Sequence, residues 1–294
     1  MYYLSIPICV ERIWGHEDLK KLFNCDKDEP IGEIWILSGY PDYETKLLKN
    51  GEEEVEIKEL TQKIFGKSIP RFPLIIKLLK AKRWLSIQVH PNDEYAIKNE
   101  NEPWGKNEAW YFLECDTETK IINGVSVKSK QELVDAIESG EIEKVLNFSK
   151  ISKGDFIYLR AGTVHALGPG ALTLEVQQTS DLTYRLYDWG SNRELHLNKA
   201  LDVIDFDNPV SEVVKLGDAF SSPYFKISKV GKESEIEGFS VLFLLEKSTI
   251  DGDPLNEYSC VVIPPDSMVH FEGSCIEFRL GEFWKKWIRT DRGL

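Results

Sequence analysis

The chain has 294 residues, 42% hydrophobic and 29% charged, which is the balance of a soluble globular protein with one large domain or two. Its 36 basic and 49 acidic residues give a net charge of −13, which excludes a broad basic surface for nucleic acid or anionic lipid. No apolar run reaches the roughly 20 residues of a membrane span. The first residues lack a basic region and are broken by Pro7, so we expect no signal peptide.

Short β-strands dominate the predicted secondary structure. They are rich in β-branched and aromatic residues and bounded by Gly, Pro, Asn or Asp, as in 156–159, 172–177, 240–245 and 276–280. Helices are predicted over 15–23, 55–65, from a capping box at Ser129 to about 139, in a short segment ending near 148, and over 197–204. We therefore predict an all-β protein with helical insertions, formed by a domain 1–205 and a smaller β unit 206–294.

The five cysteines are widely spaced and form no CxxC pair. An odd number at uneven spacing is typical of reduced thiols in a cytoplasm and not of a disulfide framework. We expect each to be a small buried apolar residue.

The segment 84–93 carries the first sign of chemistry. As a strand it places Ser86, Gln88 and His90 on one face and apolar residues on the other. A polar face turned inward in a closed β unit would need a ligand to explain it, whereas a polar face in water would need none. This segment alone favours neither interpretation.

Two further segments add possible metal ligands. Lys106 and Glu108 share a face of a predicted strand, and a strand running into a tight turn presents His165. Two imidazoles and a carboxylate, with Gln88 as a neutral oxygen ligand, suit Zn²⁺, with Fe²⁺, Mn²⁺ or Co²⁺ as alternatives. The other three histidines, at 16, 196 and 270, are expected to be ordinary hydrogen-bonded residues.

Charged residues gather around these segments. Lys77 lies within an apolar run, where a buried ammonium needs a partner, and three more cations follow at 80, 82 and 83. They could hold an anionic substrate or form a charged strand edge. The polar segment 174–189 contributes Asp181, Arg185 and Asp188, which could line a site. An Asp181–Arg185 salt bridge with a purely structural role is the alternative.

Six ordered motifs together resemble the short bacterial form of type I mannose-6-phosphate isomerases. They are IGEIWILS at 31–38, FPLIIK at 72–77, LSIQVHP at 85–91, GKNE at 105–108, AGTVHA at 161–166, and EVQQTSD with TYRLYD within 175–188. The resemblance covers most of the first 205 residues, and the C-terminal third matches weakly. Arg160 also departs from the usual Pro before Ala-Gly-Thr.

The resemblance implies a cupin-like β-barrel that interconverts mannose 6-phosphate and fructose 6-phosphate through a cis-enediol. It places one Zn²⁺ per chain on His90, Glu108 and His165, with Gln88 as an additional ligand, and an active-site arginine at Arg185. Further residues implied by the resemblance are Lys106 and Asp181 for proton transfer or substrate binding, and Ser86 and Lys77 for the phosphate.

Two other classes of function remain open. A cupin dioxygenase would use the same two histidines and carboxylate with Fe²⁺. A non-catalytic sugar-phosphate-binding cupin would keep the barrel and bind without turnover. We expect a small-molecule sugar phosphate as the ligand, no nucleic acid or membrane partner, a cytoplasmic location, and a C-terminal unit that could form a homodimer.

Overall fold

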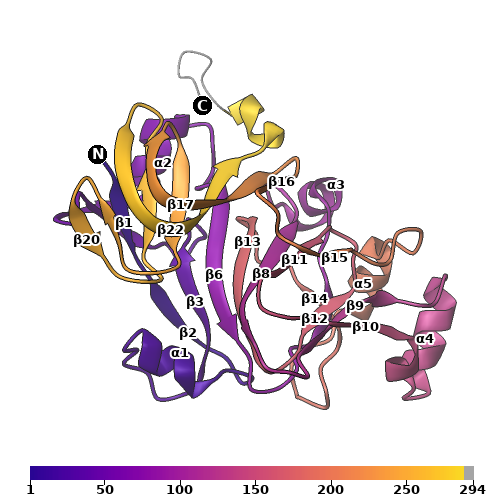
Figure 1. The fold of residues 1–294 in the computed structure, drawn as a ribbon. Helices are drawn as coiled ribbons and strands as arrows, with labels where there is room; N and C mark the ends of the chain where they lie inside the picture. Colours follow the sequence, from indigo (N-terminus) through magenta and orange to yellow (C-terminus); the bar gives the residue numbers. More distant parts are fainter. Residues whose placement is uncertain (288–294) are drawn as a thin grey trace. The chain divides into compact units, whose positions relative to one another are not determined.

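A computed structural model describes residues 1–287 of the chain. It is built mainly of antiparallel strands, which Figure 1 shows with a few short helices between them. The chain divides into two compact units, each assembled from separated stretches. Of the described residues, unit 1 contains 1–8, 35–76 and 216–287, and unit 2 contains 9–34 and 77–215.

The predicted boundary at 205/206 differs from this grouping. Residues 1–8 and 35–76 join the C-terminal stretch in unit 1, because β1 (Tyr3–Ile6) pairs with both β21 (Cys260–Ile263) and β4 (Lys46–Lys49). A strand without a neighbour leaves its main-chain N–H and C=O groups unpaired. The pairing of β1 with β21 gives the main-chain groups of both strands hydrogen-bond partners.

Unit 1 is organised around a ten-stranded sheet in the order β16-β17-β22-β18-β21-β1-β4-β5, with β19 paired to β22 and β20 paired to β19. The elements not yet given are β5 (Glu53–Glu56), α2 (Ile57–Phe65), β16 (Ala219–Ser221), β17 (Phe225–Glu237), β18 (Ser240–Leu244), β19 (Ser248–Ile250), β20 (Asp253–Leu255), β22 (Met268–Leu280) and the 3₁₀ helix η3 (Glu282–Trp287). Helix α2 buries Leu60, Ile64 and Phe65, as its helical spacing predicts.

A seven-stranded sheet has the order β15-β11-β8-β13-β6-β3-β2. Its strands are β2 (Ile8–Glu11), β3 (Ile31–Leu37), β6 (Leu74–Lys80), β8 (Glu108–Cys115), β11 (Asp155–Leu159), β13 (Ala171–Gln178) and β15 (Val213–Lys215). Every residue of β13 is buried, polar ones included. Buried polar side chains at alternate positions of such a strand need partners within the protein.

A five-stranded sheet in unit 2 has the order β10-β9-β12-β7-β14. Its strands are β7 (Ile87–Val89), β9 (Lys120–Val125), β10 (Leu146–Lys150), β12 (His165–Leu167) and β14 (Tyr184–Tyr187). Ile87 and Val89 are fully buried in a hydrophobic cluster, while Gln88 between them faces the other way and is half-buried. The alternation expected for this segment is therefore present, although the strand itself is short.

The helices of unit 2 are α1 (Glu17–Leu22), α3 (Asp93–Tyr95), the π-helix η1 (Ala96–Glu100), α4 (Lys130–Glu138), the 3₁₀ helix η2 (Ile142–Val145) and α5 (Leu197–Val203). Of these, α1, α4 and α5 form where helices were predicted, the predicted short helix ends at Val145 because 146–150 form a strand, and α3 and η1 were not predicted. The capping box of α4 is confirmed, because Glu132 donates its main-chain N–H to Ser129 Oγ at 3.3 Å and accepts from Lys128 N at 2.9 Å.

The expectation that all five cysteines are free thiols is wrong for two of them. Cys9 in β2 and Cys25 after α1 form a disulfide, with 6.0 Å between their Cα atoms. The turn of α1 brings together two residues 16 positions apart, which spacing alone does not reveal. Cys115, Cys260 and Cys275 are free, and burial raises the pKa of each thiol, that of Cys115 to about 11.

Candidate active site and metal centre

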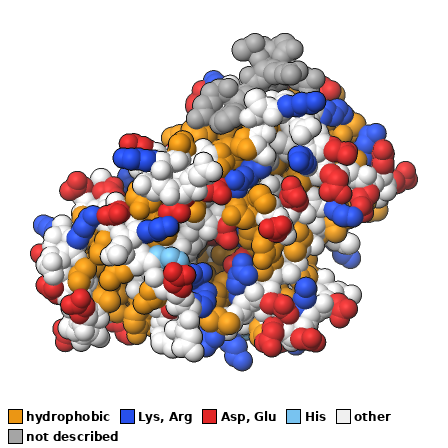
Figure 2. Space-filling view, turned by 180° about the vertical axis from the view of Figure 1, so that it is seen from behind, with side chains coloured by type: hydrophobic (Ala, Val, Ile, Leu, Met, Phe, Trp, Pro, Cys, Tyr) orange, Lys and Arg blue, Asp and Glu red, His pale blue; other side chains and the backbone are white. Residues whose placement is uncertain are grey.

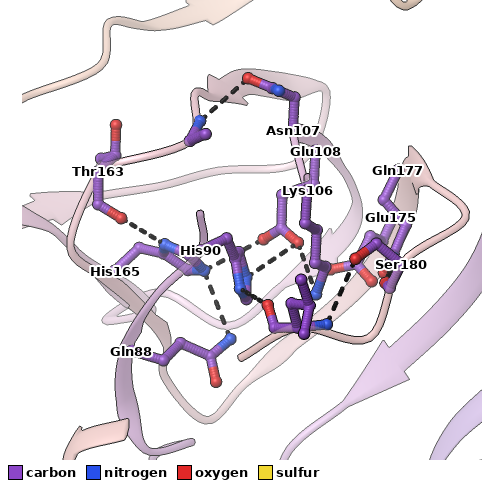
Figure 3. Close-up of polar contacts among 12 residues, drawn as sticks. Gln88, His90, Lys106, Asn107, Glu108, Thr163, His165, Glu175, Gln177 and Ser180 are labelled. Carbon is purple, nitrogen blue, oxygen red and sulfur yellow. Dashed lines mark hydrogen bonds and ion pairs between the residues drawn. The ribbon is translucent and has the colours of Figure 1, made fainter. Parts of the chain in front are cut away.

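Three side chains converge inside unit 2. His90 follows β7, Glu108 begins β8, and His165 begins β12, and all three are buried. Glu108 Oε2 lies 3.4 Å from His90 Nε2, and Glu108 Oε1 lies 3.2 Å from His165 Nε2. One ligand atom from each residue lies within 4.8 Å of the others (Figure 3). Among residues 1–287 this is the one such cluster of three or more.

Main-chain carbonyl groups orient both imidazole rings. His90 Nδ1 lies 2.8 Å from the carbonyl oxygen of Leu182, and His165 Nδ1 lies 2.9 Å from that of Thr163. Each Nδ1 must donate to its carbonyl, which leaves both Nε2 atoms as lone-pair donors facing Glu108. Burial, together with the nearby Lys106, lowers the pKa of His90 to about 3, so this ring is neutral at physiological pH.

The donor set fits a divalent cation. His90 Nε2 and both carboxylate oxygens of Glu108 are buried and make no hydrogen bond of standard geometry, while the Lys106 ammonium lies 3.0 Å from Oε2. The lone pairs of two neutral imidazoles face a carboxylate here, an arrangement that a bound cation would stabilise. Neutral imidazole and carboxylate together are the ligands that Zn²⁺ and related ions prefer.

Gln88 is the neighbour of this cluster in the five-stranded sheet. It pairs with His165 on one side and with Arg185 of β14 on the other, so the three side chains form a row. Its Nε2 lies 3.4 Å from His165 Nε2, and its Oε1 accepts a hydrogen bond from Ser86 Oγ at 3.3 Å. The sheet thus places Gln88 and Arg185 in one row with His165, and Ser86 contacts the Gln88 side chain.

Lys106 lies directly against the cluster. Its Nζ is buried and lies 3.0 Å from Glu108 Oε2. Burial alone would lower the pKa of Lys106, but the carboxylates of Glu108, Glu175 and Asp181 outweigh it and raise that pKa above its usual value. Burial would likewise raise the pKa of Glu108, yet the charge of Lys106 holds it well below its usual range.

Glu175 is a buried carboxylate to which the sequence analysis assigned no role. It is on β13, accepts a hydrogen bond from Trp110 Nε1 at 2.7 Å, and lies 3.5 Å from Lys77 Nζ. Burial and the nearby Glu108 raise the pKa of Glu175. The sequence offered one indication of a role for Glu175, its position in the polar segment 174–189. The neighbouring glutamines lie in the same segment, so this position does not single out Glu175.

Lys77 therefore has the partner that its burial requires. Its ammonium lies between Glu175 and Glu33, with the Glu33 carboxylate at 4.0 Å. Glu33 is also held by Arg12 through two hydrogen bonds of 3.0 and 3.1 Å. Positive and negative side chains thus alternate across neighbouring strands and end beside the histidine cluster.

Arg185 carries an unused donor. Its Nε is buried and has no hydrogen-bond partner, and burial together with Arg193 lowers the pKa of the guanidinium. Within residues 1–287 it makes no ion pair with Asp181, which is exposed. The salt bridge in this region instead joins Arg193 to Asp188 at 2.5 Å. The structural alternative for Arg185, an Asp181 salt bridge, is therefore not formed.

The remaining histidines have the ordinary roles expected. His16 caps α1 by accepting from Asp18 N, His196 accepts from Arg185 N, and His270 is a partly exposed residue that contacts Glu235.

Comparison with known proteins places this geometry in a family. Residues 9–116 match the model for the catalytic domain of type I phosphomannose isomerases. The mannose-6-phosphate isomerase ManA of Bacillus subtilis is 41% identical over 68% of this chain and 66% of its own length. A putative mannose-6-phosphate isomerase of the same organism, YvyI, is 36% identical over 90% of both chains.

The solved structure of a mannose 6-phosphate isomerase from Bacillus subtilis has the same architecture. It superposes with a TM-score of 0.82 at 32% identity and covers 94% of this chain and 98% of its own. The all-β, cupin-like fold and the family resemblance predicted from the sequence are both confirmed. By these relatives and by its fold, the chain belongs to the type I phosphomannose isomerase family.

Proposed function

We propose that this chain interconverts mannose 6-phosphate and fructose 6-phosphate at the cluster of His90, Glu108 and His165. The observation that carries the proposal is the convergence of buried ligand atoms from three separate segments. One Zn²⁺ per chain would be held by these residues, with Gln88 as a fourth ligand after rotation of its amide. The relatives' names supply the substrate, which the site residues alone do not specify.

The bound ion supplies Lewis acidity near the two oxygens of the sugar that exchange a proton. The chain's residues must then stabilise the negative charge of the enediolate that precedes a cis-enediol and hold the substrate while one proton moves between C1 and C2. Arg185 is suited to the first task, because its guanidinium is always charged and its Nε has no partner.

Lys106 and Asp181 are the candidates for moving protons or binding hydroxyl groups. Lys106 lies beside the cluster, 3.0 Å from Glu108 Oε2, where its Nζ can reach a substrate hydroxyl group. Asp181 is exposed and can meet a substrate from solvent. The candidates for the base that removes the carbon-bound proton are Asp181, a group of the substrate and solvent.

We also propose Ser86 and Lys77 as phosphate-side residues. Ser86 is buried beside Gln88, on the same segment as the ligands. Lys77 adds positive charge within the row that ends at Glu175, although two carboxylates already share its ammonium. Ser86 is therefore the stronger candidate of the two.

The rival functions use the same centre differently. A dioxygenase would need Fe²⁺ and molecular oxygen, and a sensor would bind sugar phosphate without turnover. Membership of an isomerase family favours the isomerase over both.

A cytoplasmic location and a homodimer stay proposals. A sugar phosphate is charged and crosses membranes poorly, which favours the compartment where it is made. No helix within residues 1–287 is long and apolar enough to cross a membrane. Figure 2 shows acidic and basic side chains interspersed over the face it presents.

A coupled assay tests the function. Purified protein given mannose 6-phosphate should form fructose 6-phosphate, lose this activity after treatment with a chelator, and regain it with Zn²⁺. Turnover that survives complete metal removal would contradict the metal-assisted reaction. Binding of mannose 6-phosphate without any turnover would favour the sensor instead.

A further inference from the structure

The metal ligands come from two different sheets. Glu108 belongs to the seven-stranded sheet, whereas His165 begins a strand of the five-stranded sheet and His90 directly follows another. Hydrogen bonds within one sheet therefore cannot fix all three relative to one another. A metal centre loses affinity when its ligands deviate by more than about 0.5 Å, so something must hold these segments in place.

Asn107 contacts two of the three ligand-bearing segments at once. It immediately precedes Glu108, and its Oδ1 accepts from the main-chain N–H of Ala161 at 3.0 Å, in the turn that leads to His165 (Figure 3). The same oxygen accepts from Tyr158 Oη at 3.3 Å. Because neighbouring residues of an extended chain point to opposite sides, the Asn107 side chain lies away from the ligand cluster.

Gln178 extends these contacts to the third segment. Its Oε1 accepts from both the main-chain N and the Nδ2 of Asn107, at 2.9 and 2.8 Å. Its Nε2 donates to Asp93 Oδ1 at 3.0 Å, three residues beyond His90. That carboxylate oxygen also accepts from Gly105 N at 2.8 Å, just before the strand that carries Glu108.

The orientation of both amides is fixed. Asn107 and Gln178 are buried, and their side-chain oxygens and nitrogens all have partners. Rotating either amide by 180° would set donor against donor or acceptor against acceptor. A fully satisfied buried network of this kind is rigid, and it fails as a unit when one member is removed.

We propose that the Asn107–Gln178 amide pair is a positioning device for the metal centre, which sets its affinity by fixing the three ligand segments against one another. This inference rests on the proposed metal site. Neither residue touches the ligand atoms, so their effect is transmitted through the turn at Ala161 and the loop at Asp93. Partners of this indirect kind typically change metal affinity by about 10- to 100-fold.

Two main-chain hydrogen bonds join the same segments and would survive in side-chain variants. Lys106 N donates to the carbonyl of Pro91 at 3.0 Å, and Gly162 N donates to that of His90 at 2.9 Å. We therefore expect a graded loss of affinity in the variants and not the loss of the site.

Metal affinity of the metal-free protein, measured by competition with a chelator, tests the proposal without relying on activity. Asn107→Ala and Gln178→Ala should each weaken Zn²⁺ binding about 10- to 100-fold. The double variant should be little worse than either single one, because the two side chains hold each other in place and removing either one disrupts the whole network. Independent effects that multiply would contradict a device acting as a pair.

Leu133→Ala is the control for general destabilisation. Leu133 is fully buried in α4 and packs in a hydrophobic cluster without contacting the amide pair. This variant should lower the melting temperature and leave Zn²⁺ affinity within about twofold of the wild type. If Asn107→Ala likewise lowers the melting temperature but binds Zn²⁺ as tightly as the wild type, the amide pair is merely structural and the inference is wrong.

Asn107→Asp serves if the alanine variant does not fold. It keeps the oxygen that accepts from Ala161 but places a carboxylate oxygen against Gln178 Oε1, so affinity should again fall. Wild-type affinity in Asn107→Asp would overturn the inference. Failure of the wild-type protein itself to bind Zn²⁺ would instead remove the proposed metal site, and this inference with it.

Discussion

The chemistry of single residues at this centre depends on which nitrogen each histidine leaves free. Carbonyl groups of Leu182 and Thr163 each take an Nδ1 proton, so that two Nε2 lone pairs face Glu108. Burial also lowers the pKa of His90, which keeps that ring neutral. The centre is thus prepared for a cation and not for an ion pair between histidine and carboxylate.

Replacing His165 by Ala should abolish bound metal and activity together. The variant keeps Glu108, His90 and the neutral amide of Gln88, and this set without the second imidazole should bind Zn²⁺ too weakly to survive purification. Elemental analysis of the purified variant beside the coupled assay provides the check, with His196→Ala as the matched control. A His165→Ala protein that retained one equivalent of zinc would contradict the ligand assignment.

Replacing Arg185 by Ala should lower kcat by about a hundredfold or more while metal content and melting temperature change little. The reason is that its unpaired Nε serves the reacting substrate and no structural ion pair is lost. Arg193→Ala is the contrasting variant, because Arg193 does form an ion pair, with Asp188. A near-normal kcat in a destabilised Arg185→Ala protein would mean that Arg185 serves the fold.

Sequence patterns predict the ligands of this site better than their supports. His90, Glu108 and His165 stand out because three motifs combine polar alternation with metal-binding residue types. No such signal comes from Glu175, Asn107 or Gln178. In the sequence, a single amide or carboxylate residue looks the same whether its side chain supports a site or faces water. Their roles depend on pairings across strands that are distant in the sequence.

Contacts with two helices hold β14, an edge strand of the five-stranded sheet, in position. Glu100, the last residue of η1, accepts from Tyr184 Oη of β14 at 2.9 Å and lies 2.7 Å from Lys199 Nζ of α5. One carboxylate therefore joins three elements next to the strand that carries Arg185. The hydrogen bond from Lys199 is the main reason that the pKa of Glu100 is lowered.

Glu100→Gln should destabilise the protein by about 1 kcal/mol at neutral pH, a small value because Lys199 is half exposed. A folded-state pKa below the usual 4.5 means that the carboxylate stabilises the fold above that pH and that this contribution is lost as the pH falls through the lowered value. The difference between wild type and variant should therefore shrink in acid.

Urea unfolding at a series of pH values measures this difference. Glu94→Gln, at an exposed position of α3, is the control and should show no comparable pH-dependent difference. A stability difference between wild type and Glu100→Gln that grows as the pH falls below 4.5 would contradict the assigned role.

At the level of elements, local patterns predict helices well and pairings poorly. The amphipathic spacing and capping residues of α2 and α4 are local, and both helices form where expected. The Cys9–Cys25 disulfide and the pairing of β1 with β21 join residues whose proximity results from the fold as a whole. No local pattern could have indicated either one.

At the scale of the whole molecule, the candidate metal ligands are confined to one of the two units. All three candidate ligands lie in unit 2, and the histidine of unit 1, His270, is partly exposed among glutamates on β22, which pairs with β17. We therefore predict that the C-terminal stretch provides no second metal site. Unit 1 instead contains a densely apolar core around Phe271 and Val261.

Titrating metal-free protein with Zn²⁺ while following the isomerisation of mannose 6-phosphate is the most direct test of the single metal centre. Activity should rise linearly and stop at one equivalent of Zn²⁺ per chain, and the His165→Ala protein should stay inactive throughout. A break at two equivalents, or full activity before any metal is added, would contradict the account.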